Sequence, residues 1–394
     1  MLHFSMKSSE RRRKNFQVDP ILEFIPSKPL TVGIELELQL LDKENLKLVN
    51  GIGPLLECCP ESPYIKPEFI QNTVEVISKV GENTAQVYAH LVHLVKAVKQ
   101  ACLTLGMELC AAGTHSFDKE LALFTPLPRY LRMETDTGYL GHSQITFATQ
   151  VHIGVQEAAQ ALYLMRAFKV YLPLLIALSA SSPFWRGYDT GFVSYRQRIL
   201  AASRSYGIPP SFNDWQQFID FYKASQRAGM IHTINDIHWD IRVRPQWGTV
   251  EVRVMDAQPT ISEAIQLASF IRVLAAYLLA HQQAGIEIMP HALPWWIEKD
   301  NCYMASRLGL EANCVVDKNG SFKSIHEIWQ IVQTEIQPYV SKIGESEYFE
   351  QLVKRVAERN ISYQRQRTVY QETHSCEKVV SALISELADN LAYS

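Results

Sequence analysis

The stretch Thr31–Leu40 reads TVGIELELQL and alternates between apolar and polar residues. Successive side chains of a β-strand point to opposite faces, so this alternation predicts a strand with one apolar face. The other face carries Gly33, Glu35, Glu37 and Gln39. Two neighbouring carboxylates repel each other, and glutamate is a poor strand former. The segment is therefore either a water-facing strand surface or one side of a site where a divalent cation offsets the repulsion.

Four further segments show the same period of two, with polar or charged residues on one face. They are Asn72–Ser78, Ile145–Val155, His238–Arg244 and Thr249–Asp256. Pro245–Gly248 separates the last two and predicts a short hairpin loop, hence antiparallel pairing. In one sheet, these strands would collect the following charged side chains on one face: Glu35, Glu37, Glu75, His152, Arg242, Arg244, Glu251 and Arg253.

Apolar residues recur at helical spacing between and after these strands. An antiparallel sheet packed against helices is an α+β architecture. No linker, repeat or low-complexity block divides the chain, so we expect an N-terminal tail over residues 1–29, partly disordered, and one domain over residues 30–394. The helices expected are Thr84–Leu105, Gln156–Ser181, Phe212–Gln226, Ser262–Gln283, Ile325–Val340, Glu347–Arg359 and Cys376–Leu391.

The composition excludes several classes of partner. The 394 residues carry a net charge of −3, which gives no basic field for nucleic acid. The longest apolar stretches, 170–185 and 264–289, are interrupted by proline or by charged residues, so neither predicts a membrane span. Seven scattered cysteines suit a reducing compartment, and we expect a cytoplasmic protein. Symmetric homo-oligomers are common among such proteins, and this chain is compatible with one.

The charged face has the chemistry of a metal and phosphate site. Carboxylates with one imidazole and no thiolate suit Mg²⁺ or Mn²⁺ better than zinc or iron. Guanidinium groups suit phosphate, because their planar fork binds it with two hydrogen bonds. The chain contains neither a P-loop nor a G-x-G-x-x-G motif. These residues therefore indicate metal-dependent phosphoryl transfer on a sheet, although a lone histidine such as His152 is more often structural than a ligand.

Eight segments, in order, resemble one known family. The resemblance runs from about Leu30 to about Leu391 and points to the glutamate–cysteine ligase type 2 family, in its bacterial carboxylate–amine ligase (YbdK-like) subfamily. The matching segments are GIELELQL from Gly33, NTVEVIS from Asn72, AAGTHSF from Ala111, TPLPRY from Thr125, VHIGV from Val151, SPFWRGYDTGFVSYRQRI from Ser182, WDIRVRPQWGTVEVRVMDAQPT from Trp239 and YQRQRTVYQET from Tyr363.

The resemblance implies a glutamine-synthetase-like fold, in which an antiparallel sheet forms a funnel-shaped active site with helices packed around it. It implies that residues 30–394 are a catalytic domain, an ATP-dependent ligase that activates the γ-carboxylate of glutamate as an acyl phosphate and joins it to an amine. Weak glutamate–cysteine ligase activity would yield γ-glutamylcysteine, ADP and phosphate. The cofactors would be ATP and two or more Mg²⁺ or Mn²⁺ ions; the substrates would be glutamate or a similar carboxylate and an amine such as cysteine.

The resemblance also implies roles for single residues. Arg253 would contact the transferring γ-phosphoryl group and, with Glu251, form the catalytic pair. Arg242 and Arg244 would join Arg253 in binding the nucleotide. Arg196 would bind the α-carboxylate of the substrate. The implied metal ligands are Glu35, His152 and Glu251 for one ion and Glu37 and Glu75 for a second, with Glu68 as a further candidate.

Three other functions are compatible with the same charged face. A phosphotransferase of the guanidino-kinase type would stop at a phosphorylated product, and an amidohydrolase on this scaffold would cleave amides without ATP turnover. A catalytically inactive protein would sense a metal or a nucleotide, but the complete set of acidic residues with Arg253 favours the ligase. The sequence departs from the family at Gln150, where many relatives have a second histidine, so one wall of the site differs.

Overall fold

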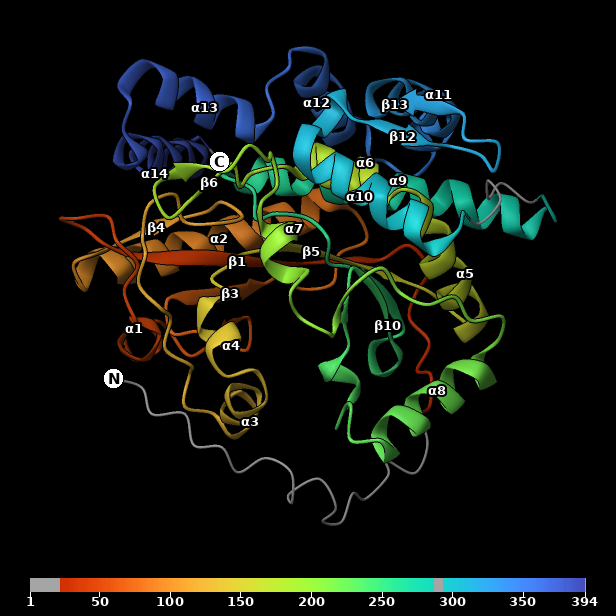
Figure 1. The fold of residues 1–394 in the computed structure, drawn as a ribbon, viewed down its shortest axis with the longest axis horizontal. Coiled ribbons are helices and arrows are strands. Elements are labelled where there is room, and N and C mark those ends of the chain that lie inside the picture. Colours follow the sequence, from red (N-terminus) through yellow and green to blue (C-terminus); the bar gives the residue numbers. More distant parts are fainter. Residues whose placement is uncertain (1–21, 287–292, 394) are drawn as a thin grey trace.

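An antiparallel sheet forms the centre of the fold (Figure 1). The computed structural model describes residues 22–286 and 293–393. The strands of the sheet are β1 (Val32–Asp42), β2 (Ile65–Pro67), β3 (Thr73–Ile77), β4 (Met107–Cys110), β5 (Thr149–Gly154), β10 (Ile241–Arg244) and β11 (Thr249–Val252). Their order is β10–β11–β5–β1–β3–β2, with β4 also paired to β1. Every neighbouring pair is antiparallel, so the predicted antiparallel sheet is confirmed.

All five segments predicted as strands contribute to this sheet, but four of the strands are shorter than predicted. The segment from Ile145 becomes a strand only at Thr149, because the backbone N–H of Phe147 bonds instead to the carbonyl of Gly113 in a loop. The segment from His238 is interrupted at Asp240, whose N–H bonds to Gly207. Its first two residues, β9 (His238–Trp239), pair with β8 (Tyr206–Gly207) in a separate parallel ribbon.

Helices cover one face of the sheet and extend from its edges. Two small ribbons accompany them, β6 (Phe184–Trp185) with β7 (Tyr188–Asp189) and β12 (Asn313–Val315) with β13 (Phe322–Ser324). The described α-helices are α1 (Ile52–Cys58), α2 (Thr84–Thr104), α3 (Pro128–Thr137), α4 (Tyr139–Ser143), α5 (Ala158–Val170), α6 (Leu172–Ser179), α7 (Arg196–Leu200), α8 (Trp215–Arg227), α9 (Ile261–Gln283), α10 (Trp295–Leu308), α11 (Ile325–Lys342), α12 (Ser346–Ala357), α13 (Ser362–Thr373) and α14 (Cys376–Ala392).

The prediction of one helix over Gln156–Ser181 is wrong. The segment forms two helices, α5 and α6, which are bent by 65° relative to each other. Pro173 lies in the first turn of α6, where its missing N–H is tolerated; a continuous helix would place it in the interior, where proline breaks the hydrogen-bond ladder.

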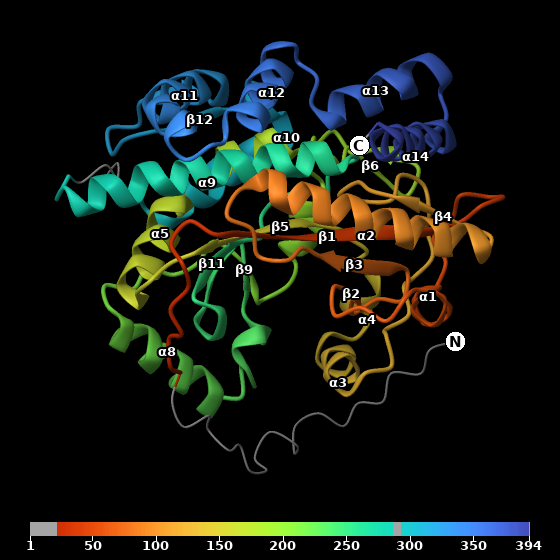
Figure 2. The same cartoon turned by 180° about the vertical axis from the view of Figure 1, so that it is seen from behind.

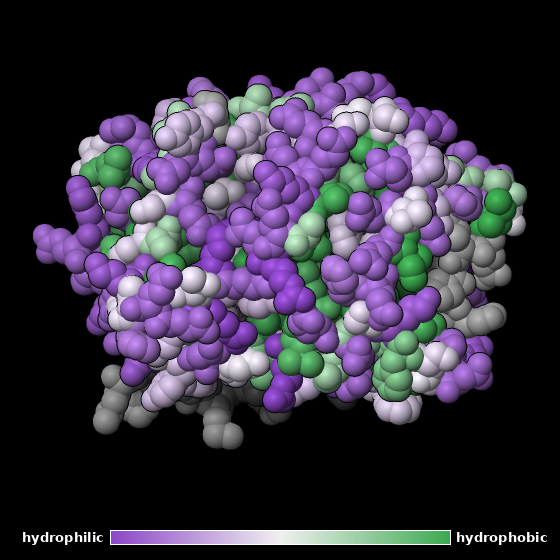
Figure 3. All heavy atoms as spheres, turned by 90° about the horizontal axis from the view of Figure 1, so that it is seen from above, coloured by the Kyte–Doolittle hydropathy of each residue, from purple (hydrophilic) through white to green (hydrophobic). Residues whose placement is uncertain are grey.

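The apolar face of β1 forms the core with two long helices. Helices α2 and α9 pack against each other and against β1, and Figure 2 shows both lying along the same face of the sheet. Helix α9 is long and apolar enough to cross a membrane, but 89% of that apolar window is buried inside the fold. Seen from above, the surface over the C-terminal helices is mostly hydrophilic, with small scattered apolar patches (Figure 3). Because most of its apolar window is buried, α9 is the central helix of the core in the described part of the chain.

Residues 22–29, which the sequence assigns to the N-terminal tail, lie against the sheet. The N–H of Ile25 bonds to the carbonyl of Pro245, and the N–H of Ser27 bonds to the carbonyl of Val155. Gly248 has a φ of +57°, and a Cβ there would lie 2.2 Å from the carbonyl oxygen of Ile25. Glycine is therefore required at the end of the β10–β11 loop. Residues 1–21 of the expected tail lie outside the described residues.

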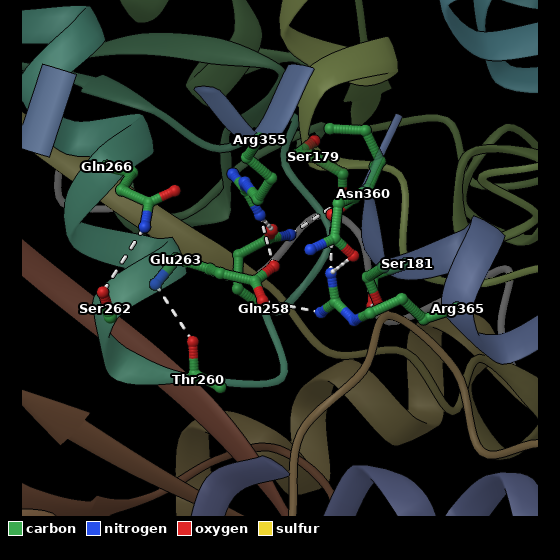
Figure 4. A network of polar contacts seen from close by, with 12 residues as sticks. Ser179, Ser181, Gln258, Thr260, Ser262, Glu263, Gln266, Arg355, Asn360 and Arg365 are labelled. Atoms are coloured by element: carbon green, nitrogen blue, oxygen red, sulfur yellow. Dashed lines mark hydrogen bonds and ion pairs between the residues drawn. The ribbon is translucent and has the colours of Figure 1, made fainter. Parts of the chain in front are cut away.

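A buried charge network fastens the C-terminal helices to the core. Glu263, in the first turn of α9, accepts hydrogen bonds from Arg355 of α12 and Arg365 of α13 (Figure 4). Arg365 also pairs with Glu386 of α14, with 2.8 Å between Nη2 and Oε2. Helix α9 thus shares one cluster of balanced charges with the three consecutive C-terminal helices α12, α13 and α14.

Replacing Glu263 with glutamine should lower the free energy of unfolding by about 3–5 kcal/mol, because two guanidinium groups lose their shared buried counter-charge. Chemical denaturation followed by circular dichroism measures this difference. The matched control is Glu358→Gln, which removes an exposed ion pair to Lys354 and should change stability by about 0.5 kcal/mol or less. Equal stability losses in the two variants would show that the network does not fasten the helices.

Candidate active site

The polar face of the sheet forms one wall of a charged pocket. The pocket has a volume of about 380 Å³ and lies on the face of β1 opposite to its apolar residues. It brings together residues from β1, β3, β5, β10 and the segments around α3 and α7. Its acidic residues are Glu35, Glu37, Glu68 and Glu75, and its arginines are Arg129, Arg196, Arg242, Arg244 and Arg253.

Strand register decides which of these side chains are neighbours. Glu37 lies opposite Glu75 in the β1–β3 pair. In the β1–β5 pair, Glu35 lies opposite Gln150. His152 of β5 lies opposite Glu251 in the β5–β11 pair. The predicted metal ligands therefore come together through backbone pairing of four strands, and not through a loop.

Glu35, His152 and Glu251 form a compact group of possible metal ligands. The Nε2 atom of His152 lies 3.1 Å from Oε1 of Glu35 and 3.9 Å from Oε2 of Glu251. The Nδ1 atom of the same ring lies 3.1 Å from Oγ1 of Thr249, which fixes the ring orientation. One ligand atom from each of the three residues lies within 4.8 Å of the others. Burial alone would raise the pKa of Glu35, but the neighbouring His152 holds that pKa below its usual value.

Glu251 is also the centre of an arginine cluster. It is fully buried and does not line the pocket. Arg242 donates two hydrogen bonds to its carboxylate, from Nε (2.8 Å) and from Nη2 (3.1 Å). Arg253 donates to Oε1, and the Nε atom of Arg244 lies 3.7 Å from Oε2. Burial would raise the pKa of Glu251, but Arg242, Arg253 and His152 hold it well below its usual value. Glu251 thus stays ionised and joins the possible metal ligands to the arginines.

Glu37, Glu68 and Glu75 form a second acidic group, in which the pKa values are raised and not lowered as they are for Glu35 and Glu251. Burial and the neighbouring carboxylates of Glu35, Glu68 and Glu37 raise the pKa of Glu75 well above its usual value. Burial and Glu68 raise the pKa of Glu37 to about 7. Burial also raises the pKa of Glu68. A divalent cation would offset this crowding of negative charge, and these oxygen donors fit Mg²⁺ or Mn²⁺.

The stabilisation of the fold by Mg²⁺ should depend on pH. Because the folded pKa of Glu37 lies above the value of 4.5 for a free side chain, the folded state holds a proton that the unfolded chain releases. Stability without metal should therefore fall as pH rises from about 4.5 to about 7. Mg²⁺ competes with that proton, so its stabilising effect should be larger at pH 8 than at pH 6. The full effect would reach about 2.7 kcal/mol at 100 times the dissociation constant.

Thermal melts with and without Mg²⁺ at the two pH values measure this difference. The matched variant is Glu75→Gln, which removes one of the crowded charges and should reduce the Mg²⁺ effect at pH 8. An Mg²⁺ effect that is the same at pH 6 and pH 8 would contradict the assignment of the acidic group.

The arginines facing the pocket have donors left over. The Nη1 of Arg253 donates to Glu251 and to Gln150, while its buried Nε makes no hydrogen bond within the described residues. The Cζ atom of Arg244 lies 4.1 Å from the ring centre of Trp247. The buried Nε of Arg244 also makes no hydrogen bond within the described residues. Burial and the adjacent Arg253 lower the pKa of Arg242 to about 10, which still leaves it cationic at neutral pH. Buried guanidinium donors of this kind suit phosphate oxygens.

Arg196 lies at the first turn of α7 and also lines the pocket. It is buried, and its Nη1 and Nη2 donate to the carbonyls of Val254 (3.0 Å) and Arg253 (3.3 Å). Asp256 accepts hydrogen bonds from the hydroxyls of Ser182 and Ser194, which hold the segment that leads to α7. The family resemblance places Arg196 in the site. It does not show that the carbonyl groups of Arg253 and Val254 hold the Arg196 guanidinium through hydrogen bonds.

Several residues of the pocket are missed by sequence reasoning. Arg129 and Tyr130 reach it from the first turn of α3, a helix that shows no strand alternation; both residues belong to the TPLPRY match. Tyr206 and His238 line it as a stacked pair with ring centres 5.1 Å apart. Burial and the nearby Arg253 lower the pKa of His238 well below its usual value, so this ring is neutral at pH 7. The parallel β8–β9 ribbon brings the two rings together, and no local pattern signals that pairing.

Two solved enzyme structures share this fold. Over 92% of this chain, the fold superposes on a bifunctional glutathione synthetase from Pasteurella multocida with a TM-score of 0.70 and 15% identity, although this chain spans only 52% of that protein. A glutamate–cysteine ligase from Francisella tularensis, in complex with AMP, gives a TM-score of 0.56 at 14% identity, with 93% of this chain and 94% of that chain covered. The fold is therefore shared with these enzymes, and the fold class implied by the family resemblance is confirmed.

Sequence relatives narrow this class to one family. The model of glutamate–cysteine ligase family 2 matches residues 31–382. A protein of Trichormus variabilis, provisionally named glutamate–cysteine ligase 2, is 44% identical over 372 residues, which cover 94% of this chain and 96% of the relative. A protein of the same provisional name from Thermobifida fusca is 33% identical, with 93% and 92% covered. The chain belongs to glutamate–cysteine ligase family 2 and is an ATP-dependent ligase.

Proposed function

We propose that this enzyme uses ATP to activate the γ-carboxylate of glutamate and then joins it to an amine such as that of cysteine. The observation that carries the proposal is the pocket itself, where buried carboxylates on β1 and β3 face buried arginines on β10 and α7. The names of the relatives supply the substrate class. We also propose that residues 30–394 act as one catalytic domain, in the cytoplasm, where the seven free cysteines would stay reduced.

The acidic residues fit two divalent cations. Glu35, His152 and Glu251 would hold one cation, and Glu37 and Glu75 would hold a second, with Glu68 nearby. Such ions supply charge neutralisation at the phosphates of ATP.

The first half-reaction transfers a phosphoryl group. An oxygen of the γ-carboxylate attacks the γ-phosphorus of ATP, the bond to the β-phosphate oxygen breaks, and ADP leaves. Arg253 stabilises the negative charge that develops on the transferring group, because its guanidinium lines the pocket and keeps a donor without a partner among the described residues. Arg242 and Arg244 contact the other phosphates, and Arg196 holds the α-carboxylate of glutamate. The product is an acyl phosphate, in which phosphate is a good leaving group.

The second half-reaction forms the amide. The nitrogen of the amine attacks the acyl carbon, inorganic phosphate leaves, and a base accepts the amine proton. ADP, phosphate and a γ-glutamyl amide are the products. A guanidino-kinase-type phosphotransferase would make no inorganic phosphate, and an amidohydrolase would need no ATP.

Trapping with hydroxylamine tests the activation step. In the presence of ATP, Mg²⁺ and glutamate, hydroxylamine should capture the acyl phosphate as γ-glutamyl hydroxamate, with equal amounts of phosphate. ADP formation without hydroxamate would point to a phosphotransferase, and hydroxamate without ATP would point to an amidohydrolase.

Arg196→Ala should raise the KM for glutamate by about 10–10²-fold while the KM for ATP stays within about threefold, because a charged hydrogen bond to a carboxylate contributes about 1.5–3 kcal/mol. Initial rates at varied glutamate and varied ATP separate the two constants. Arg204→Ala, at an exposed arginine outside the pocket, is the control and should change neither. If Arg196→Ala changes the KM for ATP alone, the substrate assignment is wrong.

A further inference from the structure

Gln150 connects the acidic half of the pocket to its arginine half. The side chain is buried, and its Nε2 donates to Oε1 of Glu37 over 2.6 Å. Its Oε1 accepts a hydrogen bond from Nη1 of Arg253. One amide therefore contacts a possible ligand of the second cation and the arginine that faces the transferring phosphoryl group.

The chemistry of the two partners allows only one orientation of this amide. A guanidinium only donates hydrogen bonds, and a carboxyl group keeps an oxygen that accepts one whether or not it is ionised. Gln150 must therefore direct its NH₂ group to Glu37 and its oxygen to Arg253. The position of the amide is fixed as well, because Gln150 lies opposite Glu35 in the β1–β5 register.

The amide also keeps two opposite charges from pairing directly. Arg253 is close enough to lower the pKa of Glu37, although burial and Glu68 raise it more. A direct ion pair between them would occupy the carboxylate oxygens and the guanidinium donors. With Gln150 between them, Glu37 has one bond on each oxygen, from Gln150 and from the N–H of Ala148, and each oxygen keeps lone-pair capacity. Arg253 keeps the donors that it does not use on Gln150 and Glu251.

We propose that Gln150 is a positioning residue that separates Glu37 from Arg253, so that the carboxylate stays available to a divalent cation and the guanidinium to the transferring phosphoryl group. The inference rests on the proposed function of the pocket. It predicts that the requirement at position 150 is one donor and one acceptor on the same uncharged group. Leucine meets neither requirement, glutamate meets only the second, and a neutral histidine meets both.

The test compares Gln150→Leu, Gln150→Glu and Gln150→His by kinetics and by calorimetric titration with Mn²⁺ in the absence of nucleotide. Outer partners of metal ligands typically contribute about 10–100-fold to metal affinity or activity. Gln150→Leu and Gln150→Glu should therefore lower kcat by about 100-fold and weaken Mn²⁺ binding by about tenfold. The KM for ATP should change by less than about threefold, because the other arginines remain. Gln150→His should recover most of both losses.

The control is Gln337→Leu, on the exposed face of α11, which should match the wild type in every measurement. Equal losses in Gln150→Leu and Gln150→His, or wild-type kcat and Mn²⁺ affinity in Gln150→Leu, would overturn the inference. If the wild type releases no phosphate with glutamate and any amine, the proposed function fails, but the Mn²⁺ titrations still decide the role of Gln150. Absence of Mn²⁺ binding by the wild type would overturn both the second cation site and this role.

Discussion

Replacing Glu251 with glutamine should lower kcat by about 10²–10³-fold, a loss comparable to removing a main electrostatic contact in other active sites. The carboxylate faces His152 on one side and the guanidinium groups of Arg242 and Arg253 on the other. An amide removes the charge that serves both sides. The cation proposed to bind Glu35, His152 and Glu251 would lose one anionic ligand. The arginines would repel each other without their shared counter-charge.

Steady-state ADP release measures this loss, and a second variant separates catalysis from stability. Glu251→Gln should also lower the melting temperature, because it leaves buried cations unpaired. Glu35→Gln keeps all the arginine contacts of Glu251 and should still lower kcat by about 10–100-fold through the cation. Glu108→Gln, on β4 of the same sheet but outside the pocket, is the control. Near-normal turnover in folded Glu251→Gln would remove the cation site from the mechanism.

Replacing Arg253 with lysine should lower kcat by about 10²-fold while the affinity for ADP falls by less than about tenfold. Lysine keeps the positive charge but loses the planar fork. Its ammonium group has three donors on one nitrogen, so contacts to Gln150 and Glu251 would leave a single donor for the phosphoryl group, without the two-pronged geometry of a guanidinium. The loss should therefore appear mainly in the transition state, when negative charge develops on the transferring group.

Kinetics together with calorimetric titration of ADP distinguish this role from simple binding. Arg204→Lys, at an exposed position, controls for the substitution itself. Equal losses in kcat and in ADP affinity would assign Arg253 to ground-state binding of the nucleotide.

The fold could be predicted from the sequence to the extent that local patterns determine it. The alternation in Thr31–Leu40 predicts β1 correctly. The pattern arises because the apolar residues of this strand face the helices and its charged residues face the pocket. The loop at Pro245–Gly248 predicts the β10–β11 hairpin, which is confirmed. The bend between α5 and α6 is not predicted, because apolar residues continue through it and only Pro173 marks the break.

The sequence predicts most of the charged residues that line the site, but it does not predict which of them contact each other. Alternation shows which strand residues share a face, and this brings Glu35, Glu37 and Glu75 to one pocket. It does not show register, which depends on pairing between segments that are far apart in sequence. The contact between Glu251 and His152 and the bridge through Gln150 follow from that register. The residue roles stay predictions until the variants are measured.

The central claim is tested most directly by one incubation of the purified protein with ATP, Mg²⁺ and glutamate, with and without a panel of amines that includes cysteine. Phosphate release and product mass are followed together. The account predicts phosphate release that requires both glutamate and one of the amines, with an equal amount of a product of the matching γ-glutamyl mass. No phosphate release with any pair, by a protein that still binds ATP and Mg²⁺, would contradict it.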